Sequence, residues 1–440
     1  MECRLVENLL ISHARGQLAQ EEAAAVDRHV TVCAACRRRL ERTVELLHVL
    51  QHSSEPDTVK LLDEVLGLAL DAGASDVHID PDAEGVRVRL RVDGVLHEVK
   101  RLPRAAHVPL ISRIHLMSDT DALRPDVPQV SRMQVRTTHA EAYCRVAVCP
   151  TYWGPRATIR ILPPGLPGSG LGHVGMSEHI REQVLSLLHR PNGLLLIAGP
   201  AGSGRNTTAY ACIEELASDG IAVFTVEDPI AAVLPGVTQV PLDPRAGLDY
   251  PAAIRALLCS DPDVLYIDDI ADTVTAASTF NAAVTGHLVV GSMYAADAPG
   301  AVARLQQISG DHYSLAEAFI GAVSQRLVRK TCGSCAETYA PSPREADLLA
   351  HHGVDPLPET LTQGRGCECC RGTGYFGRTA IHEVLVADPA LSEAIAAGTY
   401  APRLGAQTMQ ARLLDDGIPK VLAGLTTLRE VARVTGTPGL

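Results

Sequence analysis

The spacing of apolar and polar residues changes along the chain, and each change predicts a different kind of structure. In residues 1–52, stretches such as EEAAAVDRHV and RRRLERTVELLHVL place apolar residues at intervals of three and four beside charged ones. This spacing is typical of short amphipathic helices. The polar run at residues 51–56, which ends in a proline, predicts a linker after them.

Strict alternation begins in the next segment. Residues 86–99, VRVRLRVDGVLHEV, alternate apolar and polar positions on both sides of Asp93-Gly94, which predicts a half-buried hairpin with a tight turn. Alternation returns in CRVAVCP and ATIRIL. We therefore expect a small α+β domain at residues 57–165, and the Pro- and Gly-rich run 163–172 predicts a second linker.

Beyond this run the strand-like segments are continuously apolar. LLLIAG, IAVFTVED, DVLYIDD and HLVVGSM are separated by Ala-rich helical stretches. Continuous apolar strands that alternate with helices predict a mostly parallel sheet with crossover helices. We expect an α/β core at residues 173–329, followed at residues 330–440 by a cysteine cluster and two or three helical segments.

Composition narrows the class of function. The chain has 440 residues, of which 46% are apolar, so it is long enough for several domains with real cores. A net charge of −12 argues against nucleic-acid binding, which needs clustered basic surface. The sequence shows neither a transmembrane segment nor a signal peptide. These features predict a cytoplasmic protein with protein or nucleotide partners.

The cysteines near the C-terminus fall at spacings typical of a metal site. Cys332 and Cys335 form one C-x₂-C pair, and Cys367 and Cys370 form a second pair farther along the chain. Four thiolates in this arrangement suit a closed structural Zn²⁺ site. Cys369 is a spare thiol that can compete with Cys370 as the fourth ligand.

A second candidate zinc site lies near the N-terminus, where His29, Cys33 and Cys36 form an H-x₃-C-x₂-C pattern. Cys3 is the natural fourth ligand, and His13 is the alternative. A small helical bundle with incidental cysteines is the competing interpretation. The pattern resembles the zinc-binding domain at the N-terminus of anti-sigma factors.

A glycine-rich turn follows the strand LLLIA and precedes a helix. Residues 199–208 read GPAGSGRNTT, which is close to the phosphate-binding pattern G-x₄-G-K-[ST]. In that pattern the lysine reaches phosphate oxygens and the hydroxyl holds Mg²⁺. Here Arg205 takes the place of the lysine and Asn206 that of the hydroxyl residue, and Thr207 substitutes only if the loop shifts. A tight packing turn without ligand is the alternative.

A series of motifs in a fixed order resembles the bacterial type II secretion and type IV pilus assembly ATPases. Their Walker A, Asp box, Walker B, His box and tetracysteine elements correspond to GPAGSGRNTT, TVEDP, LLCSDPDVLYIDDIAD, TGHLVVGSMYAADA, and SQRLVRKTCGSC with GCECCRGTGYFGR. GASDVHI and RVRLRVDGVLHE resemble the domain that precedes the motor core. The resemblance covers residues 57–436 and implies a RecA-like P-loop core.

The resemblance also implies roles for individual residues. Glu227, Asp269 and His287 correspond to catalytic positions. The nucleotide-binding positions are Gly199, Gly202, Ser203, Gly204, Arg205, Asn206, Thr207 and Asp228. The small domain of this family lends arginines to phosphates, and the candidates for that role are Arg113, Arg132 and Arg145.

Several positions depart from the family pattern. Asp269 stands for the Walker B glutamate and has one methylene less, which withdraws its carboxylate from the reacting geometry. Asp268 replaces a glycine and adds negative charge, which disfavours ATP without well-held Mg²⁺. Tyr294 replaces the second His-box histidine, and alanines 231 and 271 replace charged residues. Together these departures predict weak or absent ATP hydrolysis.

Three functional hypotheses follow. The first is a protein of this family with a degenerate nucleotide site, acting in a secretion or pilus machine as part of a homo- or hetero-hexamer, beside inner-membrane platform proteins. The second is an active hexameric motor, and the third is a zinc-finger regulatory adaptor. The expected cofactors are Zn²⁺ and ATP or ADP with Mg²⁺. The departures from the family pattern weaken the expectation that the nucleotide and Mg²⁺ bind. Peripheral attachment at the inner membrane is expected for the first two.

Overall fold

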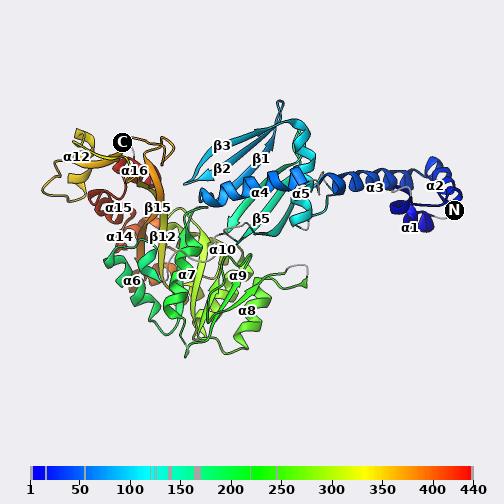
Figure 1. Ribbon diagram of the computed structural model, residues 1–440. Helices are drawn as coiled ribbons and strands as arrows, with labels where there is room; N and C mark the ends of the chain where they lie inside the picture. Colours follow the sequence, from blue (N-terminus) through cyan, green and yellow to red (C-terminus); the bar gives the residue numbers. More distant parts are fainter. Residues whose placement is uncertain are drawn as a thin grey trace. The chain divides into compact units, whose positions relative to one another are not determined.

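The computed structural model describes residues 3–14, 17–53, 56–118, 120–122, 124, 126–136, 141–162, 170–218, 220–243 and 246–437. The chain forms two compact units, residues 1–164 and residues 165–440. Figure 1 labels many of their helices and strands and colours the chain from blue at the N-terminus to red at the C-terminus.

The N-terminal segment is helical, as the spacing predicts. It contains α1 (Cys3–Ala14), α2 (Gln20–Val32) and α3 (Ala34–Ser53). A small core of Val6, Leu10, Val26 and Cys36 holds these helices together.

The linker predicted at residues 51–56 is shorter than expected. Helix α3 continues to Ser53, and α4 already begins at Pro56. Gly and Pro, the residues that end helices most strongly, are absent from α3, and a proline fits the first turn of the next helix. Ser54 and Glu55 lie outside the described residues.

A six-stranded antiparallel sheet, with order β3-β2-β1-β6-β5-β4, forms the rest of the first unit. Alternate residues of its strands pack with helices α4 and α5 in one core, and the other residues face away from it. Asp93 and Gly94 have φ of 48° and 84°, the left-handed values that a tight two-residue hairpin turn requires. The elements are α4 (Pro56–Asp71), β1 (Asp76–Pro81), β2 (Val86–Val92), β3 (Val95–Leu102), α5 (His107–Ser118), β4 (Gln129–Arg136), β5 (Glu141–Cys149) and β6 (Arg156–Leu162).

The second unit is built on a seven-stranded sheet with order β15-β12-β7-β11-β10-β8-β9. All neighbouring strands are parallel except β12 and β15. Its first part contains α6 (Glu178–Leu188), β7 (Gly193–Gly199), α7 (Arg205–Leu216), β8 (Val223–Glu227), β9 (Thr238–Pro241), α8 (Tyr250–Leu258), β10 (Val264–Ile267), α9 (Thr273–Val284), β11 (Leu288–Tyr294), α10 (Ala298–Ser309), α11 (His312–Ala318) and β12 (Phe319–Thr331).

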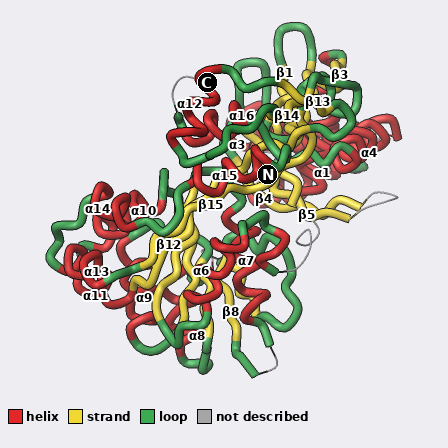
Figure 2. The backbone as a smooth tube through the Cα atoms, turned by 90° about the vertical axis from the view of Figure 1, so that its left-hand side faces the viewer, coloured by secondary structure: helices red, strands yellow, loops and turns green. Residues whose placement is uncertain are grey.

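Helices cover both faces of this sheet (Figure 2). One core lies between the strands and α6 with α7, and another between the strands and α8 to α11. This burial on both faces explains the continuously apolar strands. Of the second predicted linker, residues 163–169 lie outside the described residues, and Leu171 is buried in a short 3₁₀ turn, Leu171–His173.

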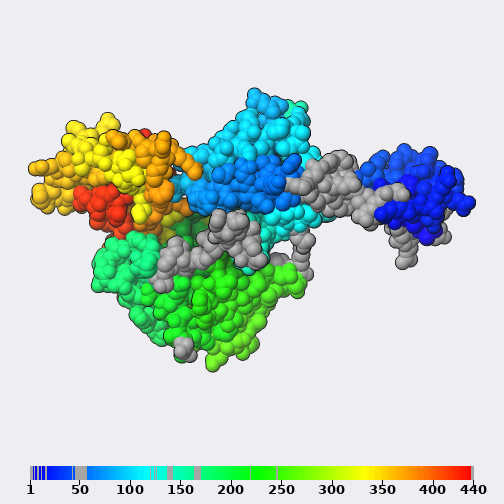
Figure 3. All heavy atoms as spheres, viewed as in Figure 1, coloured from blue at the N-terminus to red at the C-terminus, as the bar shows by residue number. Residues whose placement is uncertain are grey.

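The region after residue 330 is not only helical, contrary to expectation. Its strand β15 pairs with β12 and forms the edge of the main sheet, because its apolar residues complete that core. The segment that carries the four cysteines (residues 332–370) contributes apolar residues to a further core with the last helices, and the two form one continuous surface, yellow to red in Figure 3. The elements are β13 (Ala336–Tyr339), α12 (Pro343–His351), β14 (Leu361–Gly364), β15 (Tyr375–Val386), α13 (Pro389–Ala396), α14 (Pro402–Thr408), α15 (Leu413–Leu422) and α16 (Leu428–Thr435).

None of the helices in the described ranges is both long enough and apolar enough to cross a membrane.

Candidate nucleotide site and metal centres

The predicted phosphate loop lies at the carboxyl end of β7, directly before α7. Gly199, Gly202 and Gly204 all have positive φ, and a Cβ on Gly204 would come within 3.0 Å of the side-chain nitrogen of Gln325. These positions therefore need glycine for the loop to turn tightly into the helix. The backbone has the strand–turn–helix form of an anion-binding loop.

Arg205 points into the protein rather than out of the loop. Its side chain is 8% exposed, and Nη1 donates a 2.7 Å hydrogen bond to the carbonyl of Gly199. Its guanidinium carbon lies 3.5 Å from the centre of the Tyr294 ring, which is a close cation–π contact. The positive charge that would face phosphate is thus bound by the chain itself.

Tyr294 reaches this position because it ends β11, the strand beside β7. In the parallel register it pairs with Gly199, the last residue of β7. The amide of Ala295 also donates to the carbonyl of Gly199, at 3.3 Å. Arg205 and Tyr294, both expected departures from the family pattern, are therefore in direct contact.

The other loop residues occupy the start of α7. Asn206 and Thr207 are half-buried in its first turn. The carbonyl of Ser203 accepts a 2.8 Å hydrogen bond from Gln325, which is buried on β12. Within the described part of the chain, the buried Ser203 hydroxyl has no hydrogen-bond partner.

Two carboxylates, those of Asp268 and Asp269, follow β10 at the carboxyl end of the parallel strands, where the phosphate loop also lies. Asp268 accepts a 2.7 Å hydrogen bond from the hydroxyl of Tyr266. Burial raises the pKa of Asp268 to about 7. Burial also raises the pKa of Asp269, although the charges of Arg205 and Arg304 oppose that shift. The site thus holds an acid that is partly protonated near neutral pH.

Glu227 ends β8 and is completely buried. Its carboxylate accepts hydrogen bonds from Tyr210, from Thr225 at 2.5 Å and from Gln239 at 3.1 Å. The next residue, Asp228, is exposed. A carboxylate surrounded by three side-chain donors is poorly placed to accept a proton from water, so its visible role is structural.

His287 lies at the other end of the sheet. It precedes Leu288, which pairs with Gly193 at the start of β7, whereas the phosphate loop follows the end of β7. At roughly 3.3 Å per residue this separates His287 from the loop by about 20 Å. The structure therefore does not bring His287 to the other site residues, and Tyr294 is the His-box position that reaches them.

The three candidate arginines of the small domain divide between two environments. Arg132 and Arg145 are exposed and face each other across β4 and β5, and Arg160 on β6 is directly opposite Arg145. Arginines placed abreast repel one another. Arg160 bonds to Asp76 at 2.8 Å. Arg113 lies on α5, the helix that packs on the opposite face of the sheet, so it is not grouped with the other two.

The tetracysteine residues converge as predicted. The sulfurs of Cys332, Cys335, Cys367 and Cys370 all lie within 4.8 Å of one another. Burial raises the pKa of Cys335 to about 12. For Cys370 burial acts in the same direction, but N–H donors, chiefly the backbone amides of Cys367 and Gly374, lower its pKa to about 6.

This donor set fits a tetrahedral Zn²⁺, which would hold all four groups as thiolates. Cys369 is exposed and outside the group, so the geometry selects Cys370 as the fourth ligand.

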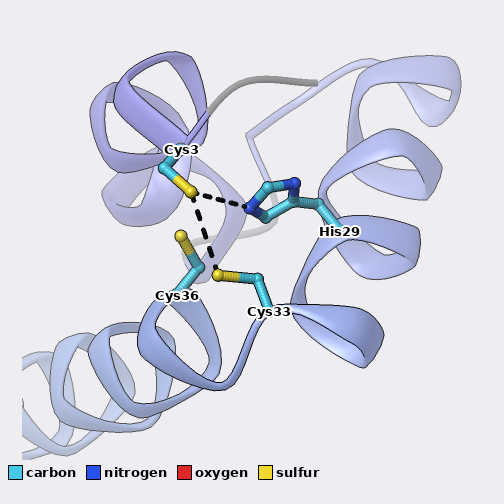
Figure 4. A group of neighbouring side chains, drawn as sticks. All are labelled: Cys3, His29, Cys33 and Cys36. Carbon is cyan, nitrogen blue, oxygen red and sulfur yellow. Dashed lines mark hydrogen bonds between the residues drawn. The ribbon is translucent and has the colours of Figure 1, made fainter.

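The N-terminal candidates also converge, and Figure 4 shows their side chains turned toward a common centre. Cys3 Sγ lies 3.6 Å from His29 Nε2 and 3.8 Å from Cys33 Sγ. His13 instead bonds to Asp27 at 3.0 Å. The structure thus favours Cys3 over His13 as the fourth ligand. The group that fits a metal ion, with its donor atoms within 4.8 Å, is Cys3, His29, Cys33 and Cys36.

Local spacing does not reveal every residue of the site. Tyr210, Tyr266 and Gln325 hold the loop and its acids, but each is an ordinary apolar-strand or helix residue in the sequence. The only available signal is their position next to a recognised motif.

Comparison with known proteins agrees with this geometry. The family model "Type II/IV secretion system protein" matches residues 51–433. The chain belongs to this family. A zinc-finger family model matches residues 3–37, which contain the N-terminal metal ligands.

Among curated members of the secretion family, the type II secretion system ATPase E of Vibrio cholerae is 36% identical over 389 residues, which cover 88% of this chain and 77% of the relative. The type IV pilus assembly ATPase PilB of Thermus thermophilus is 35% identical and matches 84% of this chain and 42% of its own length.

Two solved structures share the fold of this chain. The Legionella pneumophila ATPase DotB superposes with a TM-score of 0.62 at 19% identity, covering 86% of this chain and 95% of DotB. The pilus retraction motor PilT with bound ADP gives a TM-score of 0.60 at 22% identity, covering 86% of this chain and 97% of PilT. The α/β fold predicted from the sequence is confirmed by these likenesses.

Proposed function

We propose that this chain is a secretion or pilus ATPase-like subunit that hydrolyses ATP weakly or not at all. The observation that carries the proposal is the position of Arg205, which donates to the Gly199 carbonyl and stacks on Tyr294. In a working loop the equivalent cation reaches the phosphate oxygens. Here it must first give up two contacts within the chain.

The surrounding side chains add to this effect. Asn206 offers an amide where a hydroxyl would hold Mg²⁺, and the shorter Asp269 withdraws the carboxylate that would orient water. Asp268 brings further negative charge beside the phosphates once it ionises, which happens near pH 7. ATP with Mg²⁺ would still supply the phosphoryl chemistry if bound, and ADP would be its product. Each of these residues makes binding or turnover of that nucleotide less favourable.

Family membership supports a role within an assembly. We propose that the chain joins a homo- or hetero-hexamer on the cytoplasmic side of the inner membrane, beside platform proteins of a secretion or pilus machine. Arg132 and Arg145, which lie abreast on an exposed sheet face, would present positive charge to an anionic group of a neighbour. Structural Zn²⁺ in the two cysteine-containing sites would stabilise the ends of the subunit.

A second candidate function is the binding of a regulatory partner by the N-terminal zinc module. This is favoured by its separate zinc-finger match and by its own small core. It is compatible with a subunit that has kept the motor fold but lost most of the chemistry.

The proposal is tested by measuring phosphate release from ATP and Mg²⁺ by the native chain and by a variant carrying Arg205→Lys, Asn206→Thr, Asp269→Glu and Tyr294→His. We expect little activity in the native chain and a gain in the variant. Robust turnover by the native chain, at a rate the variant does not exceed, would reject the proposal and favour an active motor.

A further inference from the structure

The contact between Arg205 and Tyr294 joins two positions that are remote in sequence. We propose that Tyr294 is a positioning residue that holds Arg205 inside the phosphate loop and thereby sets the affinity of the loop for nucleotide phosphates. This inference rests on the proposed function, because it concerns the same loop. It adds a specific cause for weak nucleotide binding and names the residue that controls it.

The geometry gives Tyr294 this role. Because Tyr294 pairs with Gly199 across β11 and β7, its ring is fixed beside the first residue of the loop. The guanidinium of Arg205 lies against that ring at 3.5 Å and donates to the carbonyl of Gly199. Strand, ring and carbonyl thus form one site for the guanidinium.

The guanidinium needs the ring to stay in this place. Within the described residues, its Nε is buried without a hydrogen-bond partner. A buried cation with an unsatisfied donor is costly unless other contacts compensate. The π face of the Tyr294 ring is such a contact, although the residue as a whole is 44% exposed. The nearby carboxylates of Asp268 and Asp269 also attract Arg205, because its charge opposes the rise in pKa that burial causes in both.

Removing the ring therefore changes how strongly Arg205 is held within the chain relative to how strongly a bound phosphate group attracts it. Without it, the guanidinium loses its main packing surface but keeps its charge and its reach from the start of α7. A bound phosphate group would then compete successfully for it, since charge-assisted hydrogen bonds to phosphate are strong. The phenol hydroxyl has no part in the stack, so a phenylalanine ring should hold Arg205 equally well.

The test is a calorimetric titration of the full zinc-loaded chain with Mg-ADP, which measures binding without turnover. We expect Tyr294→Ala to bind on the order of tenfold more tightly than the native chain, and Tyr294→Phe to match the native chain. The gain should disappear when Arg205→Ala is added to Tyr294→Ala. Tyr294→Leu, which keeps apolar bulk without a π face, replaces Tyr294→Ala if that variant does not fold.

The inference is overturned if the variants without the ring bind Mg-ADP no more tightly than Tyr294→Phe. It is equally overturned if the gain persists without Arg205. These outcomes are distinct from failure of the proposed function, which is read from phosphate release by the native chain. Native turnover would reject the proposed function, whereas unchanged Mg-ADP binding in the variants would reject only the role of Tyr294.

Discussion

The hydroxyl of Tyr210 donates a hydrogen bond to the carboxylate of Glu227 in the interior of the second unit. The same hydroxyl accepts from the backbone amide of Ala231 at 3.0 Å. Tyr210 thus links α7, the helix of the phosphate loop, to Glu227 at the end of β8 and to the loop that follows. An acid in the Asp box, a motif associated with nucleotide chemistry, acts here as a packing centre.

The first prediction concerns this link. Glu227→Ala should lower the free energy of unfolding by about 3 kcal/mol, because it leaves the buried hydroxyls of Tyr210 and Thr225 without their acceptor. Glu227→Gln keeps one acceptor oxygen and should cost less. Equilibrium denaturation in urea measures both. Equal free energies of unfolding for the native chain and Glu227→Ala would mean that these hydrogen bonds do not stabilise the fold.

The second prediction concerns pH. Burial raises the pKa of Asp268 to about 7, whereas the pKa of an aspartate in an unfolded chain is about 3.9. Between these values the folded chain keeps a proton that the unfolded chain has released, so stability falls as pH rises. The stabilising contribution of Asp268 to the free energy of unfolding is therefore fully present below about pH 4, and it is lost as the pH rises through about 7.

Asp268→Asn cannot ionise and should escape this loss. We expect the variant to be more stable than the native chain at pH 8, by on the order of 2 kcal/mol, and the difference to shrink toward pH 5. Thermal unfolding at both pH values measures it. A difference that does not vary with pH would contradict the assigned burial of an ionising Asp268.

The third prediction concerns the tetracysteine site. Cys335→Ser should release one equivalent of zinc and destabilise the C-terminal segment, because it removes one of four convergent thiolates. Cys369→Ser is the matched control, since this thiol is exposed and outside the group. The measurement is the zinc content of both purified variants after gel filtration. Zinc loss in Cys369→Ser with retention in Cys370→Ser would reverse the ligand assignment.

The fourth prediction concerns the N-terminal site. Cys33→Ser should remove the second zinc equivalent, while His13→Ala should retain it, because His13 bonds to Asp27 instead of joining the ligand group. Metal content of His13→Ala and of Cys3→Ser separates the candidates for the fourth ligand, and the latter should lose the zinc. Loss of zinc in His13→Ala together with its retention in Cys3→Ser would favour the alternative ligand.

The sequence was informative where structure depends on nearby residues. The Asp93-Gly94 turn, the two C-x₂-C pairs and the apolar strands all carry their signal within a few positions. It was less informative for long-range pairing. Strand β15 lies far along the chain from β12, so its place at the edge of the main sheet was not predicted.

The candidate site shows the same limit more sharply. The motif order identified the phosphate loop and both acids after β10, but it could not show that Arg205 turns toward Tyr294, because that contact depends on the register of β7 and β11. The same register moves His287 to the opposite end of the sheet. A motif gives the order of residues along a strand, whereas the strand pairing decides which of its ends meets the loop.

The central claim is that the native chain has little or no ATPase activity. Its most direct test is phosphate release at saturating ATP and Mg²⁺ by the native chain, compared with Arg205→Ala prepared in parallel. The account predicts equal and near-background rates, because Arg205 is held by Gly199 and Tyr294. A native rate clearly above background that Arg205→Ala abolishes would show that Arg205 serves the phosphates, and it would contradict the account.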